Sequence, residues 1–123
     1  MITFDHVTYT YEGQTVPSLR DCSFTVEPGE LILFTGESGC GKTTIIKLIT
    51  AEIAPSGGRL MVNGYNLNNI SPRQVPYMRR TLGIVFQDFR LLQDRNVYEN
   101  VAFALEVTEM DPKEIYKKVM RVL

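Results

Sequence analysis

The 123-residue sequence predicts an α/β fold with an antiparallel β subdomain at its amino terminus. Apolar and polar residues alternate over much of residues 2–26, as they do in strands with one buried face. The unbroken apolar run at 31–34 is typical of a strand that helices cover on both faces. A glycine-rich segment at 36–43 then leads into a helical spacing of apolar residues. Together these features indicate a sheet connected through a loop to a helix.

The amino-terminal strands are expected within residues 2–11 and 19–26, where β-branched and aromatic residues recur. Turns at 12–14 and 27–30, each containing a glycine, close these segments. Residues 31–35 differ, because their apolar run is not interrupted by polar residues. We therefore expect this segment to be a strand that is buried on both faces.

The segment after the glycine-rich loop is expected to be helical from Lys42 to Ile53, because its apolar side chains recur on one face. A Pro-Ser-Gly-Gly stretch at 55–58 ends that helix. Residues 59–62 are expected to form a short strand. The dipeptide Asn63-Gly64 closes it as a two-residue hairpin turn.

Further elements are expected in the second half of the chain. A short helix is expected over residues 75–80, since the proline at its start cannot lie deep inside a helix. The apolar run at 82–86 predicts a second buried strand. An asparagine and a glutamate three residues apart form a capping box that opens a helix over residues 96–105.

The last helix is expected to begin at Asp111, with Pro112 in its first position and Glu114 completing a second capping box. Its apolar stripe is still running at Leu123, and such a face needs something to cover it. We therefore expect the chain to be truncated, the amino-terminal part of a larger domain.

Composition and charge limit the functional classes. Thirteen basic and fourteen acidic side chains give a net charge of −1. This excludes nucleic-acid binding that depends on an overall positive charge. No apolar run approaches the ~20 residues that span a bilayer, and the amino terminus does not have the pattern of a secretion signal. Cys22 and Cys40 lack the spacing of a zinc site or of a disulfide framework. A soluble, cytoplasmic protein is expected.

The segment that carries chemistry is Gly36-Glu37-Ser38-Gly39-Cys40-Gly41-Lys42-Thr43, which has the form GxxxxGK(S/T). It follows an expected strand and opens an expected helix, which is the context of a phosphate-binding loop. Glycines let the backbone of Gly36, Gly39 and Gly41 take positive φ and approach phosphate oxygens closely. Successive amides, including those of Ser38 and Cys40, then surround the anion.

The end of this loop supplies the side chains that a nucleotide needs. Lys42 can reach the β and γ phosphates, and the hydroxyl of Thr43 can ligate Mg²⁺. Thr44 follows in the first turn of the helix, whose positive end also favours the anion. The predicted ligands are the phosphates of a nucleoside triphosphate and Mg²⁺. The alternative is a glycine turn that only joins a strand to a helix.

The chain resembles the nucleotide-binding subunits of ABC transporters. The resemblance rests on Tyr11, the Pro-Gly-Glu turn at 28–30, the loop of the form GxSGxGKTT and the Val-Phe-Gln segment at 85–87. It implies a P-loop nucleoside triphosphate hydrolase core beside the antiparallel subdomain. It also implies that Tyr11 stacks on adenine, while packing of Tyr11 on the core, beside Tyr9, is the alternative.

Gln87 matches the Q-loop glutamine of this family. The resemblance implies that Gln87 contacts Mg²⁺ and the attacking water, so that Lys42 and Gln87 are the candidate catalytic residues. Phe89, Leu91 and Leu92 follow the Q-loop. They are expected either to contact a membrane partner or to fill the core.

Residues 75–105 resemble most closely the cell-division branch of the family, the FtsE type. Asp88 and the stretch 90–95 stand where exporters of lipoproteins or macrolides commonly have a serine and an Asn-Leu-Leu-Pro sequence. The implied role is ATP binding and hydrolysis coupled to a transmembrane subunit of FtsX type, by a homodimer that is peripheral on the inner face of the cell membrane. The alternatives are such an exporter ATPase, or a nucleotide-binding module that does not hydrolyse.

The resemblance also predicts a division of the chain. Residues 1–35 would form the β subdomain and the P-loop strand, 36–54 the loop and helix, 55–95 a strand and the Q-loop region, and 96–123 the start of a helical subdomain. The signature, the Walker B acids and the switch histidine of the family have no counterpart here. His6, the only histidine, is expected to be a partly exposed strand residue. We therefore expect no ATP turnover by this chain alone.

Three further features have competing interpretations. Cys40 replaces the small alanine or serine that is usual in the family. It is expected to be either a reactive thiol at a helix amino terminus or a buried small residue. The pairs Arg79-Arg80 and Lys117-Lys118 are expected to be solvated faces, and patches that bind anions are the alternative.

Overall fold

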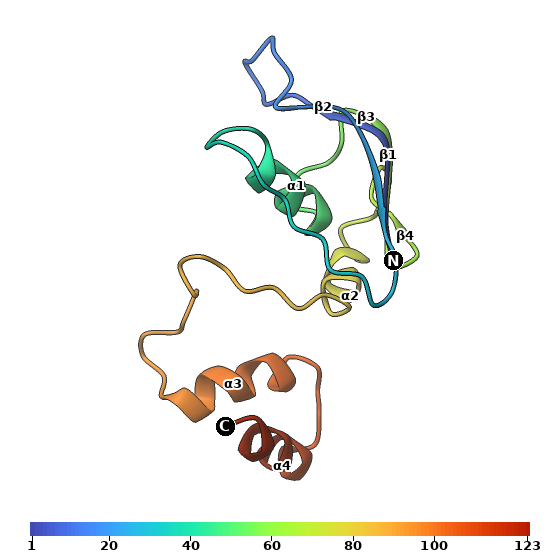
Figure 1. Ribbon diagram of the computed structural model, residues 1–123. Helices are drawn as coiled ribbons and strands as arrows, with labels where there is room; N and C mark the ends of the chain where they lie inside the picture. The colour runs from blue at the N-terminus through green and yellow to red at the C-terminus, as the bar shows by residue number, and fades with distance from the viewer. The chain divides into compact units, whose positions relative to one another are not determined.

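A computed structural model describes residues 1–123 and divides them into two compact units, Met1–Gly83 and Ile84–Leu123. The first unit holds a sheet and two helices, and the second holds a pair of helices (Figure 1). The finer division expected from the sequence remains a prediction.

The first unit is built on a four-stranded antiparallel sheet. Its strand order is β2-β1-β3-β4, and the strands are β1 (Ile2–Tyr9), β2 (Leu19–Val26), β3 (Gly57–Val62) and β4 (Tyr65–Asn66). The antiparallel subdomain predicted at the amino terminus is therefore confirmed. The strand expected at 59–62 begins earlier than predicted, at Gly57.

Asn63 and Gly64 form the turn between β3 and β4, as predicted. Their φ angles are 47° and 86°, the left-handed values that a type I′ hairpin requires at both central positions. The pairing of Val62 with Tyr65 closes the hairpin directly across this turn.

One face of the sheet packs against the first helix, α1 (Lys42–Ile49), which lies beside it in Figure 1. Phe4 pairs with Phe24 across β1 and β2, and their rings stack with centroids 4.5 Å apart. Burial of such apolar side chains is the main source of the stability of the unit. The buried core consists of Phe4, Val7, Leu19, Ile45, Leu48, Leu60, Val62, Leu67 and Met78.

α1 ends at Ile49, four residues before the predicted end at Ile53. Ala51 has a φ of 54°, in the left-handed region. The amide of Glu52 then donates to the carbonyl of Lys47 at 2.9 Å, and the amide of Ala51 to that of Leu48 at 3.0 Å. This is the Schellman pattern, which ends a helix by satisfying its last carbonyls. The apolar spacing up to Ile53 had suggested a longer helix.

The two buried strands predicted at 31–35 and 82–86 are not formed. Neither segment has a strand partner, and Leu31 and Val85 expose 97% and 92% of their surface. An apolar segment becomes a strand only where a neighbouring strand accepts its hydrogen bonds, and none does so here. Phe34 is 39% exposed, and its ring packs edge-on against that of Phe24 with centroids 5.2 Å apart.

α2 (Val75–Arg79) completes the first unit and has its proline at the start, as predicted. Its Met78 is fully buried in the core. Arg79 had been expected to form part of a solvated face. Arg79 is exposed, as expected, and its guanidinium also donates to the carbonyls of Thr50 at 2.8 Å and of Ala51 at 3.3 Å, at the end of α1.

The second unit is a helical pair of α3 (Val97–Glu106) and α4 (Pro112–Val122), which pack through Ala102, Ile115 and Val119. The capping box predicted for α3 is confirmed, with reciprocal bonds of 2.9 and 2.8 Å between Asn96 and Glu99.

α4 begins as predicted, with Asp111 as its cap and Pro112 in the first turn. The carboxylate of Asp111 accepts from the amide of Lys113 at 2.8 Å. Glu114 does not complete a capping box, because its carboxylate pairs with Lys117 at 3.2 Å instead. None of the four helices has the length and apolar character that crossing a membrane would require.

Candidate functional site

The glycine-rich loop lies between the exposed segment at 31–35 and α1. Gly39 and Gly41 have φ angles of 87° and 100°, as the sequence predicted. Gly36 does not have a positive φ, so that part of the prediction is wrong. The absence of a side chain at Gly36 matters for a different reason, since a Cβ there would lie 2.5 Å from the sulfur of Cys40.

Gly41 is the N-cap of α1 and is buried against the start of β2. A Cβ at this position would lie 2.8 Å from the carbonyl oxygen of Ser18, closer than side chains approach backbone atoms. This contact fixes the loop on the sheet. Because the N-cap residue is a glycine, no side chain caps the helix. The first turn of the helix also has no acidic residue. The amides of that turn and the positive end of the helix are thus available to an anion.

The side chain of Lys42 folds back over the loop that precedes it. Its ammonium donates to the carbonyl of Gly36 and, at 3.3 Å, to that of Glu37. The positive charge therefore lies beside the backbone of residues 36–37. A polyphosphate bound by the loop amides would find this ammonium within the same loop.

The two threonines after Lys42 have different surroundings. Thr43 is exposed at the start of α1, whereas Thr44 is only 4% exposed. The exposed hydroxyl of Thr43 is of the kind that can ligate Mg²⁺. The Thr44 hydroxyl lies 3.3 Å from the Oη atom of Tyr11.

Tyr11 lies just after β1 and reaches α1 through that bond with Thr44. Its ring meets that of Tyr9 edge-on, with centroids 4.8 Å apart and planes at 89°. The ammonium of Lys47 lies 5.8 Å from the centre of the Tyr11 ring. The first unit therefore brings Tyr11 together with the helix that follows the phosphate-binding loop.

Gln87 belongs to the second unit, and the site formed by the loop, α1 and Tyr11 consists of residues of the first. Gln87 is exposed in a turn over residues 87–90, not at the end of a strand as predicted. Phe89 and Arg90 have positive φ in this turn, and the Arg90 guanidinium lies 3.8 Å from the centre of the Phe86 ring.

The exposure of the residues that follow Gln87, and of Cys40, decides between interpretations that the sequence left open. Phe89 and Leu91 expose 73% and 61% of their surface, so they do not fill the core of the second unit, whereas Leu92 is half-buried. Cys40 is exposed, which contradicts the interpretation of a buried small residue. Cys22 is half-buried in β2, and burial, aided by the charge of Asp21, raises the pKa of its thiol.

His6 is an exposed residue of β1, as expected. Its Nδ1 atom lies 2.5 Å from Oδ1 of Asp21. This hydrogen bond, with the charges of Asp21 and then Asp5, raises the pKa of the imidazole above its ordinary value. His6 and Asp21 both have positive φ, at irregularities in the pairing of β1 with β2.

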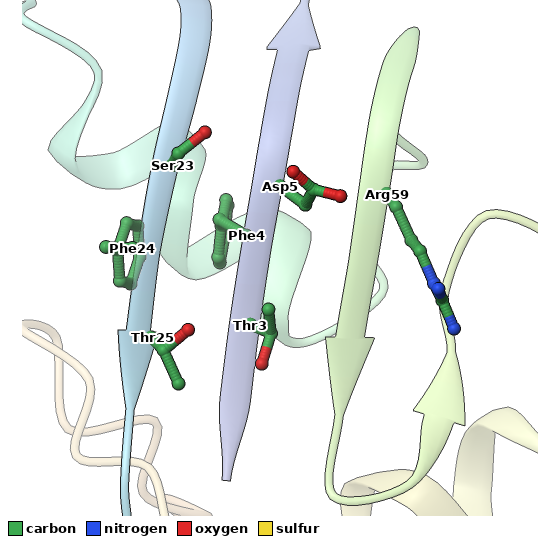
Figure 2. A pocket seen from close by; sticks show the side chains of 7 residues that line it. All are labelled: Thr3, Phe4, Asp5, Ser23, Phe24, Thr25 and Arg59. Atoms are coloured by element: carbon green, nitrogen blue, oxygen red, sulfur yellow. The ribbon is translucent and has the colours of Figure 1, made fainter.

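A shallow hollow on the sheet involves residues that the sequence did not single out. Figure 2 shows that its side chains come from the three neighbouring strands β1, β2 and β3, with Asp5 paired in register with Arg59. The hollow is lined by Thr3, Phe4, Asp5, Ser23, Phe24, Thr25 and Arg59.

No cluster of three or more His, Cys, Asp or Glu side chains suited to a metal ion occurs in the chain.

Comparison with known proteins identifies a family for this chain. The family model described as ABC transporter matches residues 19–122, a range that includes the loop, α1 and Gln87. The chain belongs to the ABC transporter family.

Its curated ABC relatives include cell-division proteins. The chain is 43% identical over 123 residues to the cell division ATP-binding protein FtsE of Mycobacterium tuberculosis, covering 100% of this chain and 54% of that protein. It is 45% identical over 108 residues to FtsE of Bacillus subtilis, covering 88% of this chain and 47% of that protein. The chain thus spans about half the length of the curated relatives it matches.

Solved ABC structures share the fold. The ATP-binding cassette MJ0796, a dimer in a post-hydrolysis state bound to ADP and Pi, matches with a TM-score of 0.86 at 26% identity, over 98% of this chain and 55% of that one. The protein cbiO1 from Clostridium perfringens, part of the ABC transporter complex cbiONQ, gives 0.85 at 26% identity, over 98% and 47%. The predicted fold class, an ABC-type α/β cassette with an amino-terminal antiparallel sheet, is confirmed.

Proposed function

We propose that the chain binds Mg-ATP through the loop of residues 36–43 and is the ATP-binding part of a cell-division ABC ATPase. The observation that supports this most directly is the 43% sequence identity to a cell division ATP-binding protein, in an alignment that spans all 123 residues. That similarity favours a role in division over export of lipoproteins or macrolides. The uncapped start of α1 and the ammonium of Lys42 within one loop fit a polyphosphate.

The proposed site uses the residues expected from the sequence. The amides of Gly36, Ser38, Gly39, Cys40 and Gly41 would surround the phosphates. Lys42 would neutralise them, and Thr43 and Thr44 would continue the site into α1. Thr43 would hold Mg²⁺, which when bound supplies further positive charge to the phosphates. By resemblance to the family's Q-loop glutamine, Gln87 would contact this ion in the complete protein. Tyr11 would stack on the base.

For the complete protein we propose hydrolysis coupled to a membrane subunit. By resemblance this partner is a transmembrane protein of FtsX type, and the ATPase acts as a homodimer that is peripheral on the inner face of the membrane. The exposed side chains of Phe89 and Leu91 after Gln87 suit contact with such a partner. A nucleic acid is not proposed as a partner, because the net charge is −1.

Calorimetric titration of the chain with Mg-ATP tests the central proposal. We expect the unmodified protein to bind and Lys42→Ala to lose most of the affinity, because one of the charges that neutralise the phosphates is removed. Lys113→Ala, which removes an exposed lysine of α4, is the matched control and should bind normally. Absence of binding, or equal binding by Lys42→Ala, would overturn the proposal.

Turnover is a separate proposal. We propose that residues 1–123 alone do not turn over ATP, because they contain no counterpart of the family's signature or of the Walker B acids. A steady-state phosphate-release assay should show no rate above background. A rate that disappears in Lys42→Ala would contradict this proposal without affecting the one on binding.

A further inference from the structure

The turn between β3 and β4 contains Asn63-Gly64, the only Asn-Gly pair in the sequence. In such a pair the backbone nitrogen of the glycine can attack the asparagine side chain, because glycine has no side chain to hinder the approach. Both residues are exposed, so water reaches them. The space around Gly64 is open as well, since a Cβ there would meet nothing within 4 Å. This chemistry is independent of the proposed nucleotide site.

The side-chain amide of Asn63 is held at both of its ends. Its Oδ1 atom accepts from the ammonium of Met1 at 3.0 Å. Its Nδ2 group donates to the hydroxyl oxygen of Thr81 at 2.9 Å and to the carbonyl of the same residue at 3.4 Å. The Thr81 hydroxyl donates its own proton to the carbonyl of Met78 at 2.7 Å, so towards Asn63 it can only accept. Each end of the amide therefore faces a group that matches it.

The backbone of the turn keeps the reacting atoms apart. Asn63 has a φ of 47°, in the left-handed region, where ψ is about +30 to +60°. At such a ψ the nitrogen of Gly64 lies on the opposite side of the Cα–C bond from the side chain of Asn63. Closure of a ring between them requires both to lie on the same side. The hairpin must therefore open before the two groups can react.

We propose that Asn63 is a site of spontaneous deamidation, which the folded hairpin suppresses and which opening of the hairpin permits. The nitrogen of Gly64 loses its proton and forms a bond with Cγ of Asn63, and the bond from Cγ to the side-chain nitrogen breaks to release ammonia. Water then opens the succinimide ring at either of its carbonyls, which leaves an aspartyl or an isoaspartyl residue. Water is the only co-reactant.

The product cannot restore the bonds that Asn63 makes. A carboxylate has no N–H to donate, so the two oxygens of Thr81 would face it without a proton between them. Its ion pair with the Met1 ammonium is exposed and contributes little. An isoaspartyl linkage also adds a carbon to the main chain of a two-residue turn, whose length sets the pairing of Val62 with Tyr65. Deamidation therefore leaves a hairpin that closes less well.

Peptide mapping by mass spectrometry tests the proposal on the whole chain, incubated at mildly alkaline pH with and without guanidinium chloride. The folded chain should deamidate Asn63 more slowly than the unfolded chain by about tenfold or more, because the reaction has to wait for the hairpin to open. Asn96 and Asn100, each followed by a valine whose branched side chain hinders attack, are internal controls and should react more slowly than Asn63 in the unfolded chain.

The role of Thr81 is tested by two matched variants. Thr81→Val removes the hydroxyl that accepts from Asn63, and it should speed deamidation of the folded chain about fivefold, the loss of one hydrogen bond, without changing the rate in guanidinium chloride. Thr81→Ser keeps the hydroxyl and should react as the unmodified chain does. Asn63→Asp, which reproduces one product, should unfold at a lower urea concentration than the unmodified chain.

Different results would overturn different parts of the proposal. Failure of Asn63 to deamidate in the unfolded chain would remove the site itself, and equal rates in the folded and unfolded chains would remove its suppression by the hairpin. A folded Thr81→Val variant that reacts at the unmodified rate would show that Thr81 does not hold the amide. If Thr81→Val does not fold, the comparison of the unmodified chain with and without denaturant decides the proposal by itself. An Asn63→Asp variant as stable as the unmodified chain would show that the product restores the lost bonds.

Discussion

The Nε atom of Arg79, in α2, donates a hydrogen bond of 2.8 Å to the carbonyl oxygen of Thr50, just past the end of α1. The same guanidinium donates to the carbonyl of Ala51 at 3.3 Å. The last carbonyls of a helix lack partners within it and carry the negative end of its dipole. Arg79 therefore supplies both donors and a positive charge at this point, and it connects α2 to the helix that follows the nucleotide loop.

We expect Arg79→Ala to lower the free energy of unfolding by about 1–2 kcal/mol, because charged hydrogen bonds to the end of α1 are lost. The change is measured by urea denaturation followed by circular dichroism. Arg73→Ala removes an exposed arginine that precedes α2, and it should change stability by less than about 0.5 kcal/mol. Equal effects of the two variants would mean that the Arg79 bonds contribute nothing.

Gly41→Ala is expected to be far more disruptive than Gly39→Ala. Both glycines have positive φ, so each alanine is strained by about 1–2 kcal/mol. At Gly41 the new Cβ also meets the carbonyl oxygen of Ser18 at 2.8 Å, whereas at Gly39 nothing lies within 4 Å. Urea midpoints of the two variants compare strain alone with strain plus a backbone collision. A Gly41→Ala variant as stable as Gly39→Ala would show that the loop does not pack on β2 as described.

Ala51→Gly is expected to stabilise the first unit. Ala51 ends α1 with a φ of 54°, and glycine avoids the steric cost of that conformation. Glycine also loses more backbone entropy on folding, so the net gain should be only about 0.5–1 kcal/mol. Ala54→Gly is the control, because Ala54 does not have a positive φ and glycine there should destabilise slightly. A loss of stability in Ala51→Gly would contradict the Schellman end.

Much of this architecture could be predicted from local sequence. Turn residues fixed the hairpin at Asn63-Gly64, and the capping box of Asn96 with Glu99 located the start of α3. Such features depend on residues a few positions apart, so a pattern of letters contains them. The glycine-rich loop and the start of α1 were predicted for the same reason.

Contacts between distant segments could not be predicted in this way. The bonds of Arg79 with the end of α1 join residues 28 and 29 positions apart, and Tyr11 and Thr44 are separated by 33. The strands predicted at 31–35 and 82–86 failed for a related reason, since an apolar run shows that a segment prefers burial but not that a partner strand is present. The titration of His6 and the alkylation of the two cysteines give two further tests of the structure.

The stability of the first unit should depend on pH through His6. Its pKa is raised from 6.5, first by the hydrogen bond with Asp21. A raised pKa means that the folded state binds the proton more tightly than the unfolded state. The stabilisation is therefore complete below pH 6.5 and is lost as the pH rises through the higher folded value.

His6 is the only histidine, so its NMR titration is free of overlap. The curve should have its midpoint above 6.5, and Asp21→Asn should move the midpoint down towards that value. Asp94→Asn, an exposed aspartate of the second unit, should leave the curve unchanged. An Asp21→Asn titration identical to that of the unmodified chain would contradict the pairing.

Alkylation of the cysteines distinguishes the loop from the sheet. Cys40 is exposed in the glycine-rich loop, whereas Cys22 is half-buried and its thiol pKa is raised by burial. Iodoacetamide reacts with the thiolate, so Cys22 should be modified more slowly than Cys40. Saturating Mg-ATP should slow modification of Cys40, because the bound phosphates would cover the loop, and should leave Cys22 unaffected. Mass spectrometry of the digested protein reports both sites in one sample, which makes Cys22 an internal control. Modification of Cys40 at the same rate with and without Mg-ATP, under conditions where calorimetry shows binding, would mean that the nucleotide phosphates lie elsewhere than beside residues 36–43.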